Sequence, residues 1–197
     1  MQKILFIDPL INATLRGEKT MTRRIAYDKP MEYEVHKGYD DAGYCILCDG
    51  WMQVAKSRFK VGETVAIAQR YRDIRDIIGD VHDGKSIKFM AGWDNKMYVK
   101  SELMPHQIQI EAIKVERIQD ISDDDCMNEG IIRRNDIINC KMEDIVRYTF
   151  DGSFENHIWK SYDNPRMAFA SLIDKISGKG TWDRNPFVFA YSYKLIK

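Results

Sequence analysis

The extended segments that recur along the chain constrain its fold more than any other feature. Residues 64–69 form an apolar, β-branched run typical of a buried strand, and residues 107–117 alternate between apolar and polar side chains. The chain closes with residues 186–193, a strand pattern with one aromatic face. Because short helical patterns lie between these segments, the sequence predicts an α+β fold whose strands form a closed or partly closed barrel.

Three helices are expected between the strands. The first covers residues 8–17, with Asp8 as its N-cap and a glycine at its end. The second covers residues 122–130, where a serine followed three residues later by Asp125 forms a capping-box pattern. The third covers residues 164–178, with apolar residues at helical spacing. No internal repeat or low-complexity linker divides the 197 residues, so we predict a single domain.

The charge balance limits the possible partners. Lys and Arg number 30, as do Asp and Glu, so the formal net charge is zero. Proteins that coat long duplex DNA neutralise many phosphates, so no such partner is expected, although a local basic pocket remains compatible with this balance. The apolar run at the N-terminus is too short for a signal peptide, and no stretch is long enough to span a bilayer. We therefore expect a cytoplasmic protein without a membrane partner.

The cysteines raise the question of a metal site. Cys45 and Cys48 form a C-x-x-C pattern, which could be half of a zinc site. A structural zinc needs four nitrogen or sulfur ligands, usually from a second close pair, and Cys126 and Cys140 are not such a pair. The alternative is that the cysteines act as small hydrophobic residues. We expect no metal and no organic cofactor.

Two segments resemble the signatures of a known family. Residues 17–24, Gly-Glu-Lys-Thr-Met-Thr-Arg-Arg, are similar to the G-x-K-T-x-T-x-R signature at the start of ASCH domains. Residues 118–122, followed by Asp125 and Glu129-Gly130, resemble the second signature, an acidic helix that ends in Glu-Gly. Three smaller similarities are typical of phage and prophage members, and they are Val61-Gly62-Glu63, Met104-Pro105 and Trp182-Asp183-Arg184-Asn185-Pro186.

The resemblance implies a PUA-like β-barrel with flanking short helices and a basic cleft between them. It covers the chain as a single domain, 1–197, and leaves residues 28–59 and 131–163 as insertions. The first insertion is rich in Asp, Gly, Lys and Tyr and is expected to be a long loop that contains a hairpin. Related domains recognise RNA or modified bases, so the implied partner is RNA or a modified nucleoside.

The resemblance also implies a site. One bacterial branch of the family removes the acyl group from N4-acetylcytidine, and its catalytic residues fall on Lys19, Thr22 and Glu129, with its motif arginine on Arg24. Thr22 could act as the nucleophile and Lys19 as its base, while Glu129 orients Lys19 or relays the proton. On a regular strand Lys19 and Thr22 point to opposite faces, so Lys19 can join Thr22 only from the turn after Gly17.

One strand departs from the family pattern. Many phage relatives read Trp-Val-Arg-Glu-x-Trp after the Val-Gly turn, whereas residues 66–71 here read Ala-Ile-Ala-Gln-Arg-Tyr. Gln69 retains hydrogen-bonding capacity without charge, which indicates a different or neutral ligand. Together with the signature residues, the side chains expected to contact a ligand are Thr20, Arg23, Arg24, Gln69 and Tyr71.

Two further residue groups have alternative interpretations. Several aromatic side chains could stack on unpaired bases, although such residues belong more often to a core; they are Trp51, Tyr71, Trp93, Tyr98, Trp159 and Trp182. The basic run Arg70, Arg72 and Arg75 alternates with aspartates, which is typical of a solvated face and not of a phosphate-binding track.

Three functional hypotheses follow, and the sequence does not decide between them. The first is a domain that binds RNA or a modified nucleoside near Lys19, Thr22, Arg24 and Glu129. The second is an amidohydrolase that deacylates N4-acetylcytidine-type nucleosides, so whether the chain is an enzyme is open. The third is a phage-derived protein-interaction module without ligand chemistry, which the altered strand at residues 66–71 favours.

Overall fold

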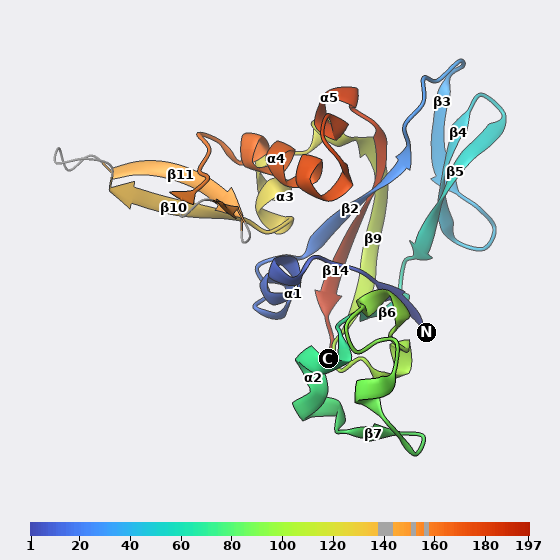
Figure 1. Cartoon of the computed structure of the whole chain (residues 1–197). Helices are drawn as coiled ribbons and strands as arrows, with labels where there is room; N and C mark the ends of the chain where they lie inside the picture. Colours follow the sequence, from blue (N-terminus) through green and yellow to red (C-terminus); the bar gives the residue numbers. More distant parts are fainter. Residues whose placement is uncertain (138–143, 151–152, 156–157) are drawn as a thin grey trace.

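A five-stranded sheet forms the centre of the computed structural model, which describes residues 1–137, 144–150, 153–155 and 158–197 (Figure 1). Its strands lie in the order β1 (Gln2–Ile4), β6 (Thr64–Ile67), β9 (Gln107–Arg117), β14 (Phe187–Leu195) and β2 (Met21–Tyr27). The β1–β6 pair is parallel and the other pairs are antiparallel. Sheets and helices occur together, which confirms the α+β prediction.

The sheet does not close on itself. In the described part of the chain, β1 and β2 stand at the two ends of the strand order and do not pair with each other. The hydrogen-bonded strands therefore form an open sheet and not the closed barrel that was one of the expectations. The long strands expected at residues 107–117 and 186–193 are present as β9 and β14, and they supply most of the buried face of the sheet.

A second sheet is formed by the segment that was expected to be a loop with a hairpin. Residues 28–59 contain three antiparallel strands, β3 (Val35–Tyr39), β4 (Tyr44–Asp49) and β5, which extends to Lys60 (Met52–Lys60). Leu47 and Phe59 are buried in the main core, and the Tyr39 hydroxyl donates to the carbonyl of Ile113 at 2.7 Å. The prediction was incomplete because a third strand and its contacts with the central sheet cannot be read from local polarity.

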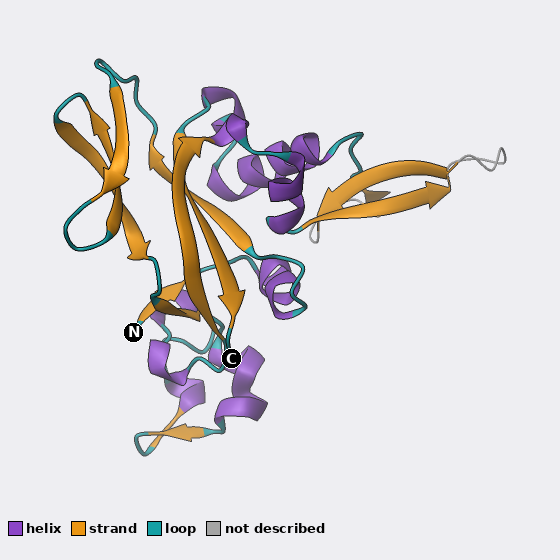
Figure 2. Ribbon diagram, turned by 180° about the vertical axis from the view of Figure 1, so that it is seen from behind, coloured by secondary structure: helices purple, strands orange, loops and turns teal. Residues whose placement is uncertain are grey.

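The helices lie mainly on the opposite side of the central sheet from this second sheet, as both views show (Figures 1 and 2). They are α1 (Asp8–Leu15), α2 (Tyr71–Ile78), α3 (Asp123–Asn128), α4 (Pro165–Ser177) and α5 (Thr181–Arg184). Short 3-10 turns are η1 (Ile87–Phe89), η2 (Lys96–Tyr98), η3 (Ser101–Leu103) and η4 (Ile118–Asp120). Among the described residues, no helix combines the length and apolar character that crossing a bilayer requires.

The start of one helix agrees with the sequence prediction, and the start of another differs from it. The Asn164 side chain caps α4, accepting from the backbone N–H of Met167 at 2.9 Å, as expected. At α1 the N-cap is Ile7, so the assignment of Asp8 as the cap was wrong. The Asp8 carboxylate instead accepts from the Lys96 ammonium and the Arg70 guanidinium, both at 2.8 Å.

The second insertion forms a hairpin that projects away from the central sheet (Figure 1). Its strands are β10 (Ile131–Ile137) and β11 (Asp144–Phe150), and two short strands follow, β12 (Phe154–Glu155) and β13 (Ile158–Trp159). A further two-stranded hairpin joins β7 (Val81–His82) and β8 (Lys85–Ser86). Cys140 lies outside the described residues, and so does the side chain of Trp159.

Candidate functional site

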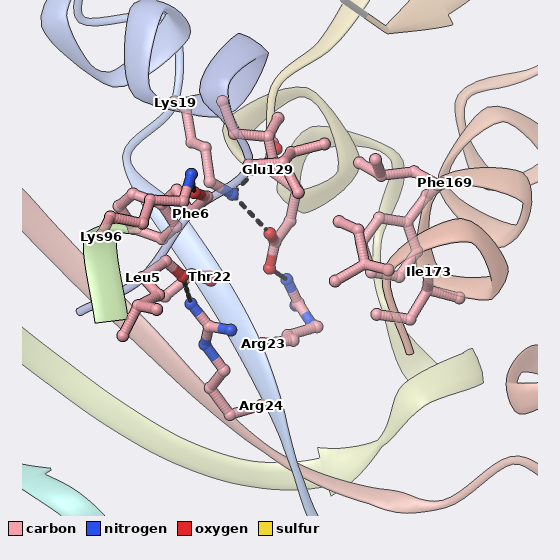
Figure 3. A pocket seen from close by; sticks show the side chains of 14 residues that line it. Leu5, Phe6, Lys19, Thr22, Arg23, Arg24, Lys96, Glu129, Phe169 and Ile173 are labelled. Atoms are coloured by element: carbon pink, nitrogen blue, oxygen red, sulfur yellow. Dashed lines mark hydrogen bonds and ion pairs between the residues drawn. The ribbon is translucent and has the colours of Figure 1, made fainter. Parts of the chain in front are cut away.

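A cavity of about 250 Å³ lies where β2 meets α1, α3 and α4 (Figure 3). Five of the residues singled out in the sequence line it, and they are Lys19, Thr22, Arg23, Arg24 and Glu129. The remaining wall is mainly apolar and consists of Leu5, Phe6, Ile7, Leu10, Lys96, Phe169, Leu172, Ile173 and Ile176. Two signatures that are about a hundred residues apart in sequence therefore meet at one cavity.

Lys19 enters this cavity from the turn that precedes β2. Gly17 adopts a left-handed conformation with φ of 76°, and Lys19 precedes the first residue of the strand. Its side chain can therefore reach the cavity that Thr22 lines from within the strand. The geometric condition for bringing Lys19 and Thr22 together is met.

The Lys19 ammonium is fully enclosed by acceptors. It donates to the backbone carbonyls of Met21 at 2.6 Å and Glu129 at 2.9 Å, and to the carboxylate Oε2 of Glu129 at 2.7 Å. The side chain has no exposed surface. Burial lowers the pKa of Lys19, while the adjacent carboxylate of Glu129 opposes this effect. A buried lysine with a depressed pKa is a common form of proton acceptor in enzyme sites.

Glu129 is held in place by the way in which α3 ends. The Ser122 hydroxyl caps the start of this helix, accepting from the backbone N–H of Asp125 at 3.1 Å, and Glu129 is its C-cap residue. The backbone N–H of Thr20 donates to the carbonyl of Asn128 at 2.9 Å, which fastens the end of the helix to the turn before β2. The helix C-terminus is unfavourable for a carboxylate, so the cations beside Glu129 must supply compensation.

Arg23 supplies much of that compensation. Its Nη1 lies 3.1 Å from Glu129 Oε1, its Nη2 lies 2.6 Å from Asp125, and its Nε lies 2.8 Å from Glu116. The Arg23 side chain has no exposed surface. Because three carboxylates occupy its donors, Arg23 positions Glu129 and leaves little capacity for a ligand. The expected capping box is only half formed, since the Asp125 carboxylate binds Arg23 and Lys114.

Two groups at the cavity remain available to a ligand. Within the described residues, the Thr22 hydroxyl makes no hydrogen bond and Arg24 makes no ion pair, although both residues line the cavity. Among the described residues, the Arg24 guanidinium donates a hydrogen bond to the carbonyl of Leu5 (Figure 3), and it lies 5.7 Å from the centroid of the Phe6 ring. A hydroxyl and a cation therefore face the cavity with unused hydrogen-bonding capacity.

Three residues expected to contact a ligand are absent from the cavity wall. Thr20 lies beside α3, where its hydroxyl is 3.3 Å from the Asn128 amide oxygen. Gln69 bonds to His106 at 2.6 Å. Tyr71 is fully buried at the start of α2 in a separate apolar cluster, and its hydroxyl accepts from the backbone N–H of Lys100. A strand was expected over residues 64–69, but β6 ends at residue 67. Gln69 and Tyr71 therefore do not continue this strand.

The other side chains considered from sequence are dispersed. Cys45 and Cys48 are an odd number of positions apart on β4, so their thiols lie on opposite faces. The described residues contain no group of three or more metal-ligating side chains.

Trp51 and Tyr98 are exposed, Trp93 packs against the smaller apolar cluster, and Trp182 packs against Phe169. Arg70, Arg72 and Arg75 form exposed ion pairs, as expected.

The apolar wall of the cavity was missed by the sequence reasoning. Phe169 and Ile173 were recognised only as part of a helical stripe, and Phe6 follows the short first strand. Lys96 lies in η2 and reaches the rim by donating to the carbonyl of Phe6 and to Asp8. No local signal separates an apolar residue that lines a cavity from one that fills a core.

Gly130 offers a test of how tightly this site is assembled. It has φ of 97°, and a Cβ atom there would lie 3.2 Å from Leu10 and 3.6 Å from the Lys19 side chain. We expect Gly130→Ala to lower the free energy of unfolding by about 1–3 kcal/mol, measured by urea denaturation. Gly62→Ala is the matched control, because Gly62 has φ of 83° but open space around its Cβ position. Equal losses in the two variants would contradict close packing at Gly130.

Comparison of the chain with family models, with curated proteins and with solved structures found no match.

Proposed function

We propose that this chain is an amidohydrolase that removes the acyl group from an N-acylated nucleobase of the N4-acetylcytidine type. One observation carries the proposal: a hydroxyl without a partner among the described residues, Thr22, lines the same small cavity as the fully buried ammonium of Lys19. Amide hydrolysis needs a nucleophile, a base that activates it and a group that holds the base in place. Glu129, which is bonded to both Lys19 and Arg23, fits the third role.

The proposed reaction has two stages. The Thr22 Oγ1 adds to the acyl carbonyl carbon, and its proton passes to the neutral amine of Lys19. The C–N bond then breaks, the proton moves from Lys19 to the leaving exocyclic amine, and the acyl group remains on Thr22 as an ester. Water hydrolyses this ester, releases the carboxylic acid and restores the threonine hydroxyl. Arg24, which has no ion pair within the described residues, is placed to donate to the carbonyl or to the base.

A PUA-like architecture belongs to the same proposal. It is supported by the antiparallel core of the central sheet and by the contacts of β5 with β2 and β9. It is also supported by the meeting of β2 with the end of α3, the two elements that carry the ASCH-like signatures. Location in the cytoplasm remains a prediction.

The direct experiment is to incubate the protein with N4-acetylcytidine and to follow the release of cytidine by chromatography. Turnover that is proportional to protein concentration is the expected result. The matched sample contains protein that carries Lys19→Met, which keeps an unbranched side chain but has no basic nitrogen. Absence of turnover with a folded wild-type protein would overturn the proposed activity.

The pH dependence of turnover tests the role of the lysine. If neutral Lys19 is the base, kcat rises with pH as Lys19 loses its proton, and the midpoint lies below the ordinary lysine value of 10.5 because burial lowers the pKa of Lys19. The carboxylate of Glu129 raises this pKa, so Glu129→Gln should move the rising limb to lower pH. If the midpoint of the rise of kcat with pH is the same in Glu129→Gln as in the wild type, the role of Glu129 beside Lys19 is contradicted.

A binding protein without turnover is the second candidate. It is favoured by the three acceptors around Lys19, because a protonated ammonium satisfies all three and a neutral amine does not. Saturable binding of cytidine with no release of acetate would select this candidate. A loss of affinity in Arg24→Gln would then place the ligand in the cavity.

A further inference from the structure

A second cavity, of about 380 Å³, adjoins the proposed active site. Leu5 and Arg24 line both cavities, so the two hollows meet at the Arg24 side chain. The second cavity lies between β2 and β5, and its apolar residues are Ile4, Leu5, Ile25, Ala26, Val54, Ala55, Phe59 and Phe189. A ligand larger than one base could therefore extend from the first cavity past Arg24 into the second.

The charged side chains that line this second cavity are all positive. Its charged lining residues are Arg24, Lys56 and Arg58, and no acidic side chain of the described residues lines it. Tyr191 also lines the cavity, and its hydroxyl oxygen accepts a hydrogen bond from the backbone N–H of Arg58 at 3.0 Å. Cavities with cations and no carboxylate are suited to anions, and a guanidinium matches the geometry of a phosphate in particular.

Within the described residues neither Arg24 nor Arg58 forms an ion pair, and the side-chain partner of Arg58 is the amide of Gln2 at 3.5 Å. Lys56 contributes less, because its ammonium lies 2.6 Å from the Asp40 carboxylate. Burial lowers the pKa of Arg24, the carboxylate of Glu129 opposes this effect, and the nearby positive charge of Arg58 adds to it. Arg24 is half-buried and Arg58 is exposed beside it, so an anion bound between them would compensate the partly desolvated guanidinium of Arg24 and would reach Arg58 as a second donor.

We infer that the cavity at Arg24 and Arg58 binds a phosphate group, so that a nucleotide or an RNA strand is a better ligand of this protein than a free nucleoside. The assignment of the base to the first cavity rests on the proposed function, whereas the phosphate site rests on the two arginines alone. The phosphate can be a terminal monoester or a diester within a strand, and both present the same oxygen atoms to a guanidinium.

Calorimetric titration of the full chain with four probes tests this inference. The probes are cytidine, cytidine 5′-monophosphate, ribose 5-phosphate and a cytidine pentanucleotide. We expect the monophosphate to bind at least about tenfold more tightly than cytidine at low salt, and we expect this advantage to shrink as salt is added. The pentanucleotide distinguishes the two sources, since it binds more tightly than the monophosphate only if the site accepts a diester.

A charge variant and a matched control locate the effect. Arg58→Gln should remove most of the advantage of the monophosphate and leave the affinity for cytidine unchanged. Lys60→Gln removes one positive charge from the same strand, but Lys60 does not line the cavity, so this variant should behave like the wild type. Equal losses in both variants would indicate only a general effect of charge and would overturn the assignment.

The outcomes separate the two proposals. Turnover of N4-acetylcytidine with no preference for phosphorylated ligands would overturn the phosphate site and leave the proposed activity standing. Binding of ribose 5-phosphate that depends on Arg58, without turnover of N4-acetylcytidine, would support the phosphate site and overturn the proposed activity. If no phosphorylated probe binds, the phosphate site is excluded whatever the nucleoside does.

Discussion

Replacing Thr22 with valine is expected to lower kcat for N4-acetylcytidine by at least about a thousandfold, the size of effect seen when an attacking hydroxyl is removed. Valine has nearly the shape of threonine, and the hydroxyl makes no hydrogen bond within the described residues. The fold and the apolar contacts should therefore be retained, with a change in the free energy of unfolding of about 1 kcal/mol or less. Binding of cytidine, the product, should also be retained.

Thr20→Val is the matched control for this experiment. Thr20 carries the same side chain two positions earlier but lies outside the cavity wall, where it contacts Asn128. Its substitution should leave kcat within about twofold of the wild type, as for an ordinary surface change without a catalytic role. Mass spectrometry of the intact protein during turnover adds a second measurement, because an acyl-enzyme carries one additional acyl group on Thr22. Equal rates in the two variants would exclude Thr22 as the nucleophile.

Replacing Arg23 with methionine is expected to have the largest effect on stability, a loss of about 3–5 kcal/mol in the free energy of unfolding. The Arg23 side chain is completely buried and contacts the carboxylates of Glu116, Asp125 and Glu129. Removing the cation leaves these negative charges close together with reduced compensation, while methionine preserves much of the packing. Urea denaturation at neutral pH measures the loss.

Lys114→Met is the control for this second prediction. Lys114 also pairs with Glu116 and Asp125, at 3.1 and 2.7 Å, but about half of its side chain is exposed. Exposed ion pairs contribute about 0–1 kcal/mol, so this variant should lose far less stability than the Arg23 variant. Similar losses would show that the carboxylates are solvated well enough not to need the buried guanidinium.

The local parts of the fold were predictable because their determinants are local. Asn164 as the cap of α4, Gly130 after α3 and the alternation in β9 each depend on residues within one or two turns of the chain. Asp8 was misassigned for the opposite reason. Its partners, Lys96 and Arg70, are distant in sequence, and their contacts with its carboxylate outweigh a cap of modest energy.

The candidate site was predictable only in part. The ASCH-like signatures pointed to Lys19, Thr22 and Glu129, and the structure brings these residues to one cavity. Gln69 and Tyr71 were expected there because they correspond to residues of a strand in the family pattern, but β6 ends at Ile67, and α2 begins at Tyr71 and turns its side chain into another cluster. A strand end and a helix start are difficult to separate when the segment is short and apolar.

The sequence by itself determined the α+β class, the positions of the long strands and the order of the signature residues, because hydrophobic period and capping residues act over short distances. Only the tertiary structure decided which charges meet. It placed Arg23 among three carboxylates, buried Lys19 against Glu129 and, within the described residues, left Arg24 and Arg58 without an ion pair. Pairing of charges depends on distances in space and on exclusion of water, and neither is encoded in the spacing of residues along the chain.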